Sequence, residues 1–155
     1  MGCDIHTLVQ VKKDGVWRDS DLEVFDCCSY GIFGFLANVR NYSEVPCISE
    51  PRGLPDDWSQ DYTESLGLNC GDYHSYSWLT LSELLNYDYN IVFWDRRISR
   101  VMSTGWIDGA ATAASGEGRM IKIRDFLGNY FFDELFRMLE LGDSDNVRVI
   151  FWFDN

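Results

Sequence analysis

The chain has only two histidines, and both occur in the same short pattern. Each histidine follows an aspartate by two positions and precedes a hydroxyl residue. The two copies are Asp4-x-His6-Thr7 and Asp72-x-His74-Ser75. Aspartate and neutral imidazole are ligands for zinc, manganese or iron, and residues two apart on a strand point to the same side. If the two pairs meet in space, they would supply four ligands.

This pattern predicts a divalent metal site made of Asp4, His6, Asp72 and His74. Asp154 is a candidate fifth ligand if the last strand lies beside the first. Such a metal would activate water, so the reaction would be a hydrolysis. The alternative is that each aspartate simply fixes its neighbouring backbone through hydrogen bonds. Beyond such a metal, the sequence indicates no cofactor.

A second interpretation is a polar pocket for a small phosphate-bearing molecule. Arginine binds phosphate through two parallel hydrogen bonds, and aromatic rings stack on nucleobases. Histidine and serine would add polar contacts. The candidate ligand-binding residues are Asp4, His6, Arg40, Arg52, His74, Ser75, Ser77, Trp78 and Asp154.

The net charge of −12 restricts the partners. It disfavours direct binding of DNA or RNA, because such binding depends on contacts between cations and phosphates. It permits a small ligand or a basic protein partner. Four carboxylates in the middle of the chain could imitate the phosphates of a nucleic acid and occupy a basic groove of another protein. They are Asp56, Asp57, Asp61 and Glu64.

Length and composition predict one folded domain over residues 1–155. No apolar run approaches the roughly 20 residues of a membrane-spanning helix, and the start of the chain does not resemble a secretory signal. The five cysteines are an odd number without a C-x-x-C pair, which favours reduced thiols and a cytoplasmic location. The sequence leaves the oligomeric state open.

The hydrophobic pattern predicts an α+β fold. Two apolar runs flank Asp14-Gly15, a dipeptide typical of a tight β-hairpin turn, and alternation places Asp4 and His6 on one face of the first strand. The final segment 147–155 is apolar on both faces, so we expect it in the centre of an antiparallel or mixed sheet, beside the first strand.

Two to three helices and a long loop complete this expectation. Helical spacing appears over 30–40 and 123–142, and Thr80 with Glu83 forms a capping box for a third helix. In the 123–142 helix the expected buried stripe is Phe131, Leu135, Met138 and Leu139. Residues 41–78 hold all three prolines and show no clear period. Residues 103–119 are rich in small side chains and are expected to be flexible.

Several segments together resemble a family of small proteins found mainly in bacteriophage and prophage genomes, for which no reaction is established. The resemblance covers most of the chain. Its segments are "MGCDIH", "FGFLANVR", "RGLPDDWS", "DYHSYSWLTLSELL" and the terminal "VRVIFWFDN". Gln10 stands where relatives tend to carry an acidic residue.

The resemblance implies an accessory protein that works in the cytoplasm of a bacterial host, against host defence. We therefore expect a protein that binds a nucleotide-like signal in a polar pocket. The alternatives are an acidic mimic of nucleic acid and a metal-dependent hydrolase that uses the two D-x-H motifs.

Overall fold

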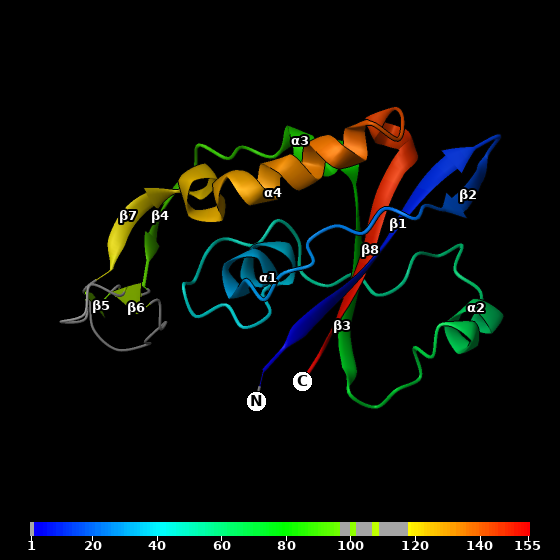
Figure 1. Ribbon diagram of the computed structural model, residues 1–155, viewed down its shortest axis with the longest axis horizontal. Helices are drawn as coiled ribbons and strands as arrows, with labels where there is room; N and C mark the ends of the chain where they lie inside the picture. Colours follow the sequence, from blue (N-terminus) through cyan, green and yellow to red (C-terminus); the bar gives the residue numbers. More distant parts are fainter. Residues whose placement is uncertain (1, 97–99, 102–106, 109–117) are drawn as a thin grey trace.

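The computed structural model describes residues 2–96, 100–101, 107–108 and 118–155. Its centre is a four-stranded antiparallel sheet in the order β2-β1-β8-β3 (Figure 1). The strands are β1 (Asp4–Lys13), β2 (Val16–Asp19), β3 (Tyr73–Thr80) and β8 (Val147–Asp154). The fold class is α+β, and the first and last strands are adjacent, as the sequence predicted.

The hairpin of β1 and β2 turns at the predicted dipeptide. Asp14 has φ +52° and Gly15 has φ +77°. Two consecutive residues with positive φ form the primed turn whose twist matches that of a two-stranded ribbon. The turn sets the register, in which Gln10 pairs with Asp19. This register places the side chains of Gln10 and Asp19 on the same face of the sheet.

Three helices contribute to the main hydrophobic core of the sheet. They are α1 (Tyr30–Ala37), α3 (Leu81–Asn86) and α4 (Ile123–Leu139). Phe33 of α1 and Phe131 of α4 are fully buried in the same cluster as Phe151 and Phe153 of β8. The predicted capping box is confirmed, because Thr80 accepts the backbone N–H of Glu83 and the Glu83 carboxylate accepts the N–H of Thr80.

Helix α4 departs from the expected continuous helix at Gly128, which has φ +76° and ψ 175°. These angles are accessible essentially only to glycine, so two helical segments meet there. Phe131, Leu135 and Met138 form the buried stripe. Leu139 does not belong to it, because its side chain is 39% exposed at the end of the helix.

The opposite face of the sheet is covered by part of the long 41–78 segment. This segment contains the short helix α2 (Gln60–Ser65) and leads into β3. A second apolar cluster joins Leu68 to Ile150 and Trp152 of β8, with Leu8, Trp58 and Trp78 packed against it. Strand β8 is therefore buried on both faces, which confirms its expected central place.

Smaller elements lie outside the main sheet. Strand β4 (Val92–Asp95) pairs with β7 (Arg119–Lys122), β5 (Arg100–Val101) pairs with β6 (Ile107–Asp108), and the short helix η1 (Ser144–Asn146) precedes β8. Most of the segment expected to be flexible, residues 103–119, lies outside the described residues. Within the described ranges, no helix is long and apolar enough to cross a membrane.

Candidate functional site

The histidines of the two D-x-H motifs lie on opposite faces of the main sheet. Across β8, His6 pairs with Trp152, whereas His74 pairs with Phe153. Paired residues point to the same side, and consecutive residues of a strand point to opposite sides. His6 accordingly stacks on Trp152 with ring centroids 5.7 Å apart, and His74 stacks on Phe153 at 6.1 Å on the helix side.

This separation corrects the predicted four-ligand metal site. His6 and His74 cannot share an ion through the sheet, and Asp72 precedes β3 as an exposed residue. In the part of the chain that the structure describes, no group of three or more His, Cys, Asp or Glu side chains could hold a metal ion. Asp4, His6, Asp72 and His74 therefore do not form one site.

Asp4, His6 and Asp154 do come together where β1 and β8 pair. His6 Nε2 lies 3.0 Å from Asp154 Oδ2, and the backbone N–H of Asp4 donates to Asp154 Oδ1 at 3.2 Å. The hydrogen bond with His6, more than that with Asp4, holds the pKa of Asp154 below its ordinary value. Arg40 reaches the same end of the sheet and donates to Asn155 Oδ1 at 2.8 Å.

Arg52, Ser77 and Trp78 form a separate group. The Arg52 guanidinium pairs with both carboxylate oxygens of Glu83, at 2.6 and 3.1 Å, and lies 5.2 Å from the centre of the Trp78 ring. Its backbone N–H donates to the buried Ser77 hydroxyl. The contact with Arg52 is the main reason that the pKa of Glu83 is lowered. This arginine connects a loop to α3.

His74 and Ser75 form a third group at a β-bulge in β3. The register between β3 and β8 shifts after His74, and Ser75 takes a positive φ of +54°. His74 Nδ1 contacts Ser75 Oγ at 2.9 Å, while the buried Nε2 has no hydrogen-bond partner. The nine predicted ligand-binding residues thus divide into three groups and do not line one pocket.

A pocket of about 270 Å³ adjoins the first of these groups. Its lining includes His6, the only predicted site residue in it, and the carboxylates of Glu23 and Asp26. The full lining is Ile5, His6, Thr7, Glu23, Val24, Asp26 and Trp152.

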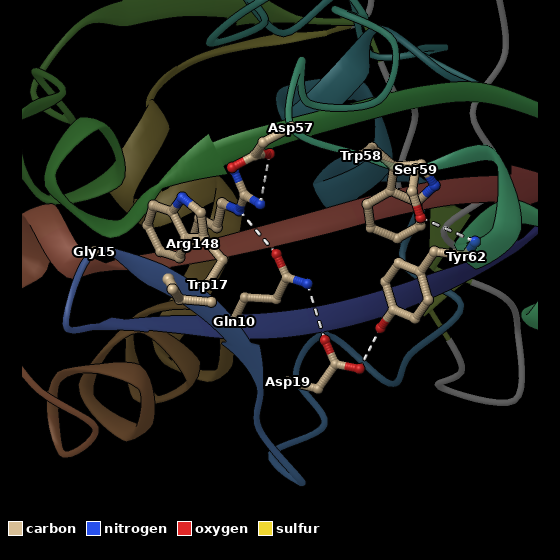
Figure 2. A pocket seen from close by; sticks show the side chains of 10 residues that line it. Gln10, Gly15, Trp17, Asp19, Asp57, Trp58, Ser59, Tyr62 and Arg148 are labelled. Carbon is tan, nitrogen blue, oxygen red and sulfur yellow. Dashed lines mark hydrogen bonds and ion pairs between the residues drawn. The ribbon is translucent and has the colours of Figure 1, made fainter.

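A larger pocket, of about 450 Å³, is lined by Gln10 and Arg148 farther along the sheet face that carries His6 and Trp152. Figure 2 shows this pocket from close by. We call it the Arg148 pocket. Its lining is Gln10, Gly15, Val16, Trp17, Asp19, Asp57, Trp58, Ser59, Tyr62 and Arg148. Strands β1, β2 and β8 supply one side of the pocket, and the other side comes from residues 57–59 before α2 and from Tyr62 of α2. Its volume is within the range of small-molecule sites.

The Arg148 guanidinium is held in a fixed position. Its side chain is only 6% exposed. Nε donates to Gln10 Oε1 at 2.9 Å, Nη2 donates to Asp57 Oδ1 at 3.0 Å, and the group lies 4.2 Å from the centre of the Trp17 ring. Nη1 has no hydrogen-bond partner among the described residues. It is also not among the side-chain atoms that are buried without a partner. The guanidinium therefore retains a donor for a ligand.

A series of hydrogen-bonded side chains extends from Arg148 through Gln10 and Asp19 to Tyr62. Gln10 Nε2 donates to Asp19 Oδ1 at 2.9 Å, and the Tyr62 hydroxyl donates to the other oxygen of Asp19. Burial and then the contact with Asp19 raise the pKa of Tyr62, so its phenol stays neutral and donates. The ring of Tyr62 lies 4.5 Å from that of Trp58. In Figure 2 these two rings lie across the pocket from Trp17 and Arg148.

The sequence analysis selected one residue of this pocket, Asp57, and only as part of an acidic surface. One feature of the sequence did indicate Arg148, because an arginine in a strand that is apolar on both faces must find buried partners. Gln10 pairs with it across β1 and β8 at 2.9 Å. No comparable feature of the sequence indicated that Trp17, Trp58 or Tyr62 would line a pocket, since most aromatic residues belong to a core.

The comparisons with known proteins add no relative: no family model, curated protein or solved structure matches this chain.

Proposed function

We propose that this protein binds a small nucleotide-like ligand, and that the ligand occupies the Arg148 pocket. The observation that carries the proposal is the buried guanidinium, which is fixed by Gln10, Asp57 and Trp17 and keeps Nη1 without a partner. A donor that is already positioned costs little entropy to use when a ligand binds.

The aromatic walls support a planar ligand. Trp17 lies on one side of the pocket, and Trp58 and Tyr62 lie on the other. Nucleobases stack on such rings, and each stacked base contributes about 1–3 kcal/mol. The site differs from the one expected from the sequence, and the part of the expected ligand that these walls support is its aromatic ring.

Binding is better supported than hydrolysis. The ten residues that line the Arg148 pocket include no histidine or cysteine, and the Ser59 hydroxyl already accepts the backbone N–H of Tyr62. The D-x-H hydrolase required two motifs that the sheet separates. Action as a phage accessory protein against host defence remains part of this proposal and rests on the sequence resemblance.

Isothermal titration calorimetry with a panel of nucleosides and nucleotides tests the proposal. At least one member should bind, and Trp17→Ala should weaken its binding roughly tenfold, because the variant loses one aromatic wall of the pocket and the ring against which the Arg148 guanidinium is held. Trp94→Ala is a matched control, because Trp94 is an exposed tryptophan of β4 outside the pocket. Absence of heat with every compound at high protein concentration would refute the proposal.

The acidic surface favours a second candidate function, inhibition of a basic host protein. Asp56, Asp57, Asp61 and Glu64 are all exposed, and they lie on α2 and the turn before it. Asp57 also holds Arg148, so a fair test leaves it unchanged.

The test compares capture from a bacterial lysate by the wild-type protein and by an Asp56→Lys, Asp61→Lys, Glu64→Lys variant. A mimic should retain a basic partner at 50 mM NaCl, release it at 500 mM and lose it in the variant. Equal capture by both proteins would exclude this candidate.

A further inference from the structure

We infer that the Arg148 pocket selects a neutral ring, a free nucleobase or a nucleoside, over its phosphorylated forms. This inference rests on the proposed function and specifies its ligand. It follows from the charges around the pocket and from two hydrogen-bonding atoms, one on Arg148 and one on Asp57, that have no partner among the described residues.

The charges of the pocket disfavour an anion. The lining holds two carboxylates, Asp19 and Asp57, and one guanidinium, while the exposed Lys12 ammonium lies 5.7 Å from the centre of the Trp17 ring and the whole chain carries a net charge of −12. Asp57 is half exposed at the rim, so phosphates extending from a bound ring toward solvent would approach it. A phosphate that accepted the hydrogen bond of Arg148 Nη1 would lie close to the Asp57 carboxylate, whose negative charge would repel it.

The same pocket disfavours a cation. Carboxylates and aromatic rings together often bind ammonium or guanidinium groups. Here the Arg148 guanidinium already occupies the face of Trp17 at 4.2 Å, and Gln10 and Tyr62 already satisfy both oxygens of Asp19. A second cation would be placed beside a buried positive charge. A neutral ring avoids both penalties.

The unused atoms match the edge of a base. Arg148 Nη1 is a free donor, and Asp57 Oδ2 is an acceptor with no partner among the described residues. The two side chains are joined by a 3.0 Å hydrogen bond and lie together on one side of the pocket (Figure 2). A base edge offers an acceptor next to an N–H donor, so one ring can engage both.

Calorimetry on the full chain tests this inference with guanosine, adenosine, cytidine and uridine and with their 5′-triphosphates. At 50 mM NaCl the best nucleoside should bind at least fivefold more tightly than its triphosphate. The difference should shrink at 500 mM NaCl, because salt screens the repulsion. A triphosphate that binds more tightly than its nucleoside overturns the inference.

Asp57→Asn separates charge from hydrogen bonding, because asparagine keeps an acceptor oxygen. The variant should improve triphosphate binding relative to nucleoside binding by at least threefold. Asp56→Asn is the matched control, since Asp56 is an exposed neighbour that does not line the pocket. An equal effect of both substitutions would show that only overall charge matters and would overturn the role of Asp57.

Caffeine tests the edge contact, because it can stack but has no N–H donor for Asp57. It should bind at least tenfold more weakly than the best nucleoside, and equal binding would overturn the contact.

Different results would refute the proposed function and this inference. If no compound binds, both are refuted. If triphosphates bind best and Trp17→Ala abolishes their binding, the pocket is correct and only its preference for a neutral ring is wrong.

Discussion

At the scale of single residues, one carboxylate controls the chemistry of an exposed thiol. All five cysteines are free, and the Cys28 thiol donates to Asp4 Oδ1 at 3.2 Å. This hydrogen bond, and then the negative charge of Asp4, raise the pKa of Cys28. The thiolate is the reactive form, so Cys28 should react slowly at pH 8.

Asp4→Asn should therefore accelerate the alkylation of Cys28 by iodoacetamide several-fold at pH 8, because the lower pKa of the thiol increases its thiolate fraction. Mass spectrometry of the peptides gives the rate at each cysteine. Cys70, which is also exposed, provides the internal control and should keep its rate. An unchanged rate at Cys28 would contradict the role of Asp4.

The pair of His6 and Asp154 gives a prediction about acid. The pKa of Asp154 is lower in the folded protein than its unfolded value of about 3.9, so its contribution is present above that pH and is lost as the pH falls through the folded pKa. Asp154→Asn should lower the free energy of unfolding at pH 6 by up to about 1 kcal/mol, since the pair is partly exposed.

Urea unfolding of both proteins at pH 6 and pH 2.5 measures this effect. The difference between wild type and Asp154→Asn should nearly vanish at pH 2.5. The same measurements on Asp143→Asn, at an exposed position, provide a control that should show no such change with pH. A difference that persists at pH 2.5 would show that Asp154 stabilises the fold by packing and not by its charge.

At the scale of elements, Gly128 decides the shape of α4. Its φ of +76° with ψ of 175° lies in a region that other residues occupy only at a cost of about 1–3 kcal/mol. Gly128→Ala should therefore lower the free energy of unfolding by roughly that amount, although a Cβ would meet no atom within 4 Å. The loss would come from the backbone alone.

Urea unfolding again provides the measurement. Gly71→Ala is the matched control, because Gly71 is an exposed glycine without a positive φ and has the same open space around its Cβ position. It should change the stability little. If Gly128→Ala is as stable as Gly71→Ala, then α4 can run through position 128 as the continuous helix expected from the sequence.

At the scale of the whole molecule, the surplus of negative charge should oppose folding. A net charge of −12 on one chain produces repulsion that salt screens. The melting temperature should therefore rise between 10 and 300 mM NaCl. The Asp56→Lys, Asp61→Lys, Glu64→Lys variant, which halves the net charge, should melt at a higher temperature than wild type in low salt and respond less to added salt. Equal salt responses of the two proteins would contradict this explanation.

The sequence by itself determined the local features and the class of the fold. The hairpin turn at Asp14-Gly15 and the capping box of Thr80 with Glu83 depend on the conformations and hydrogen bonds of neighbouring residues. The central place of the last strand followed from its apolar side chains on both faces. The adjacency of the first and last strands was also correctly expected. It brings His6 and Asp154, which the sequence had suggested only as fellow ligands of a metal, into direct contact.

Only the tertiary structure decided where the candidate site lies. A shift of one residue in strand register moves a side chain to the other face, and no local pattern fixes the register of His6 and His74 against β8. The same holds for Arg148, whose partner Asp57 is 91 positions away in the chain. A pocket between such distant segments exists only after the whole chain has packed.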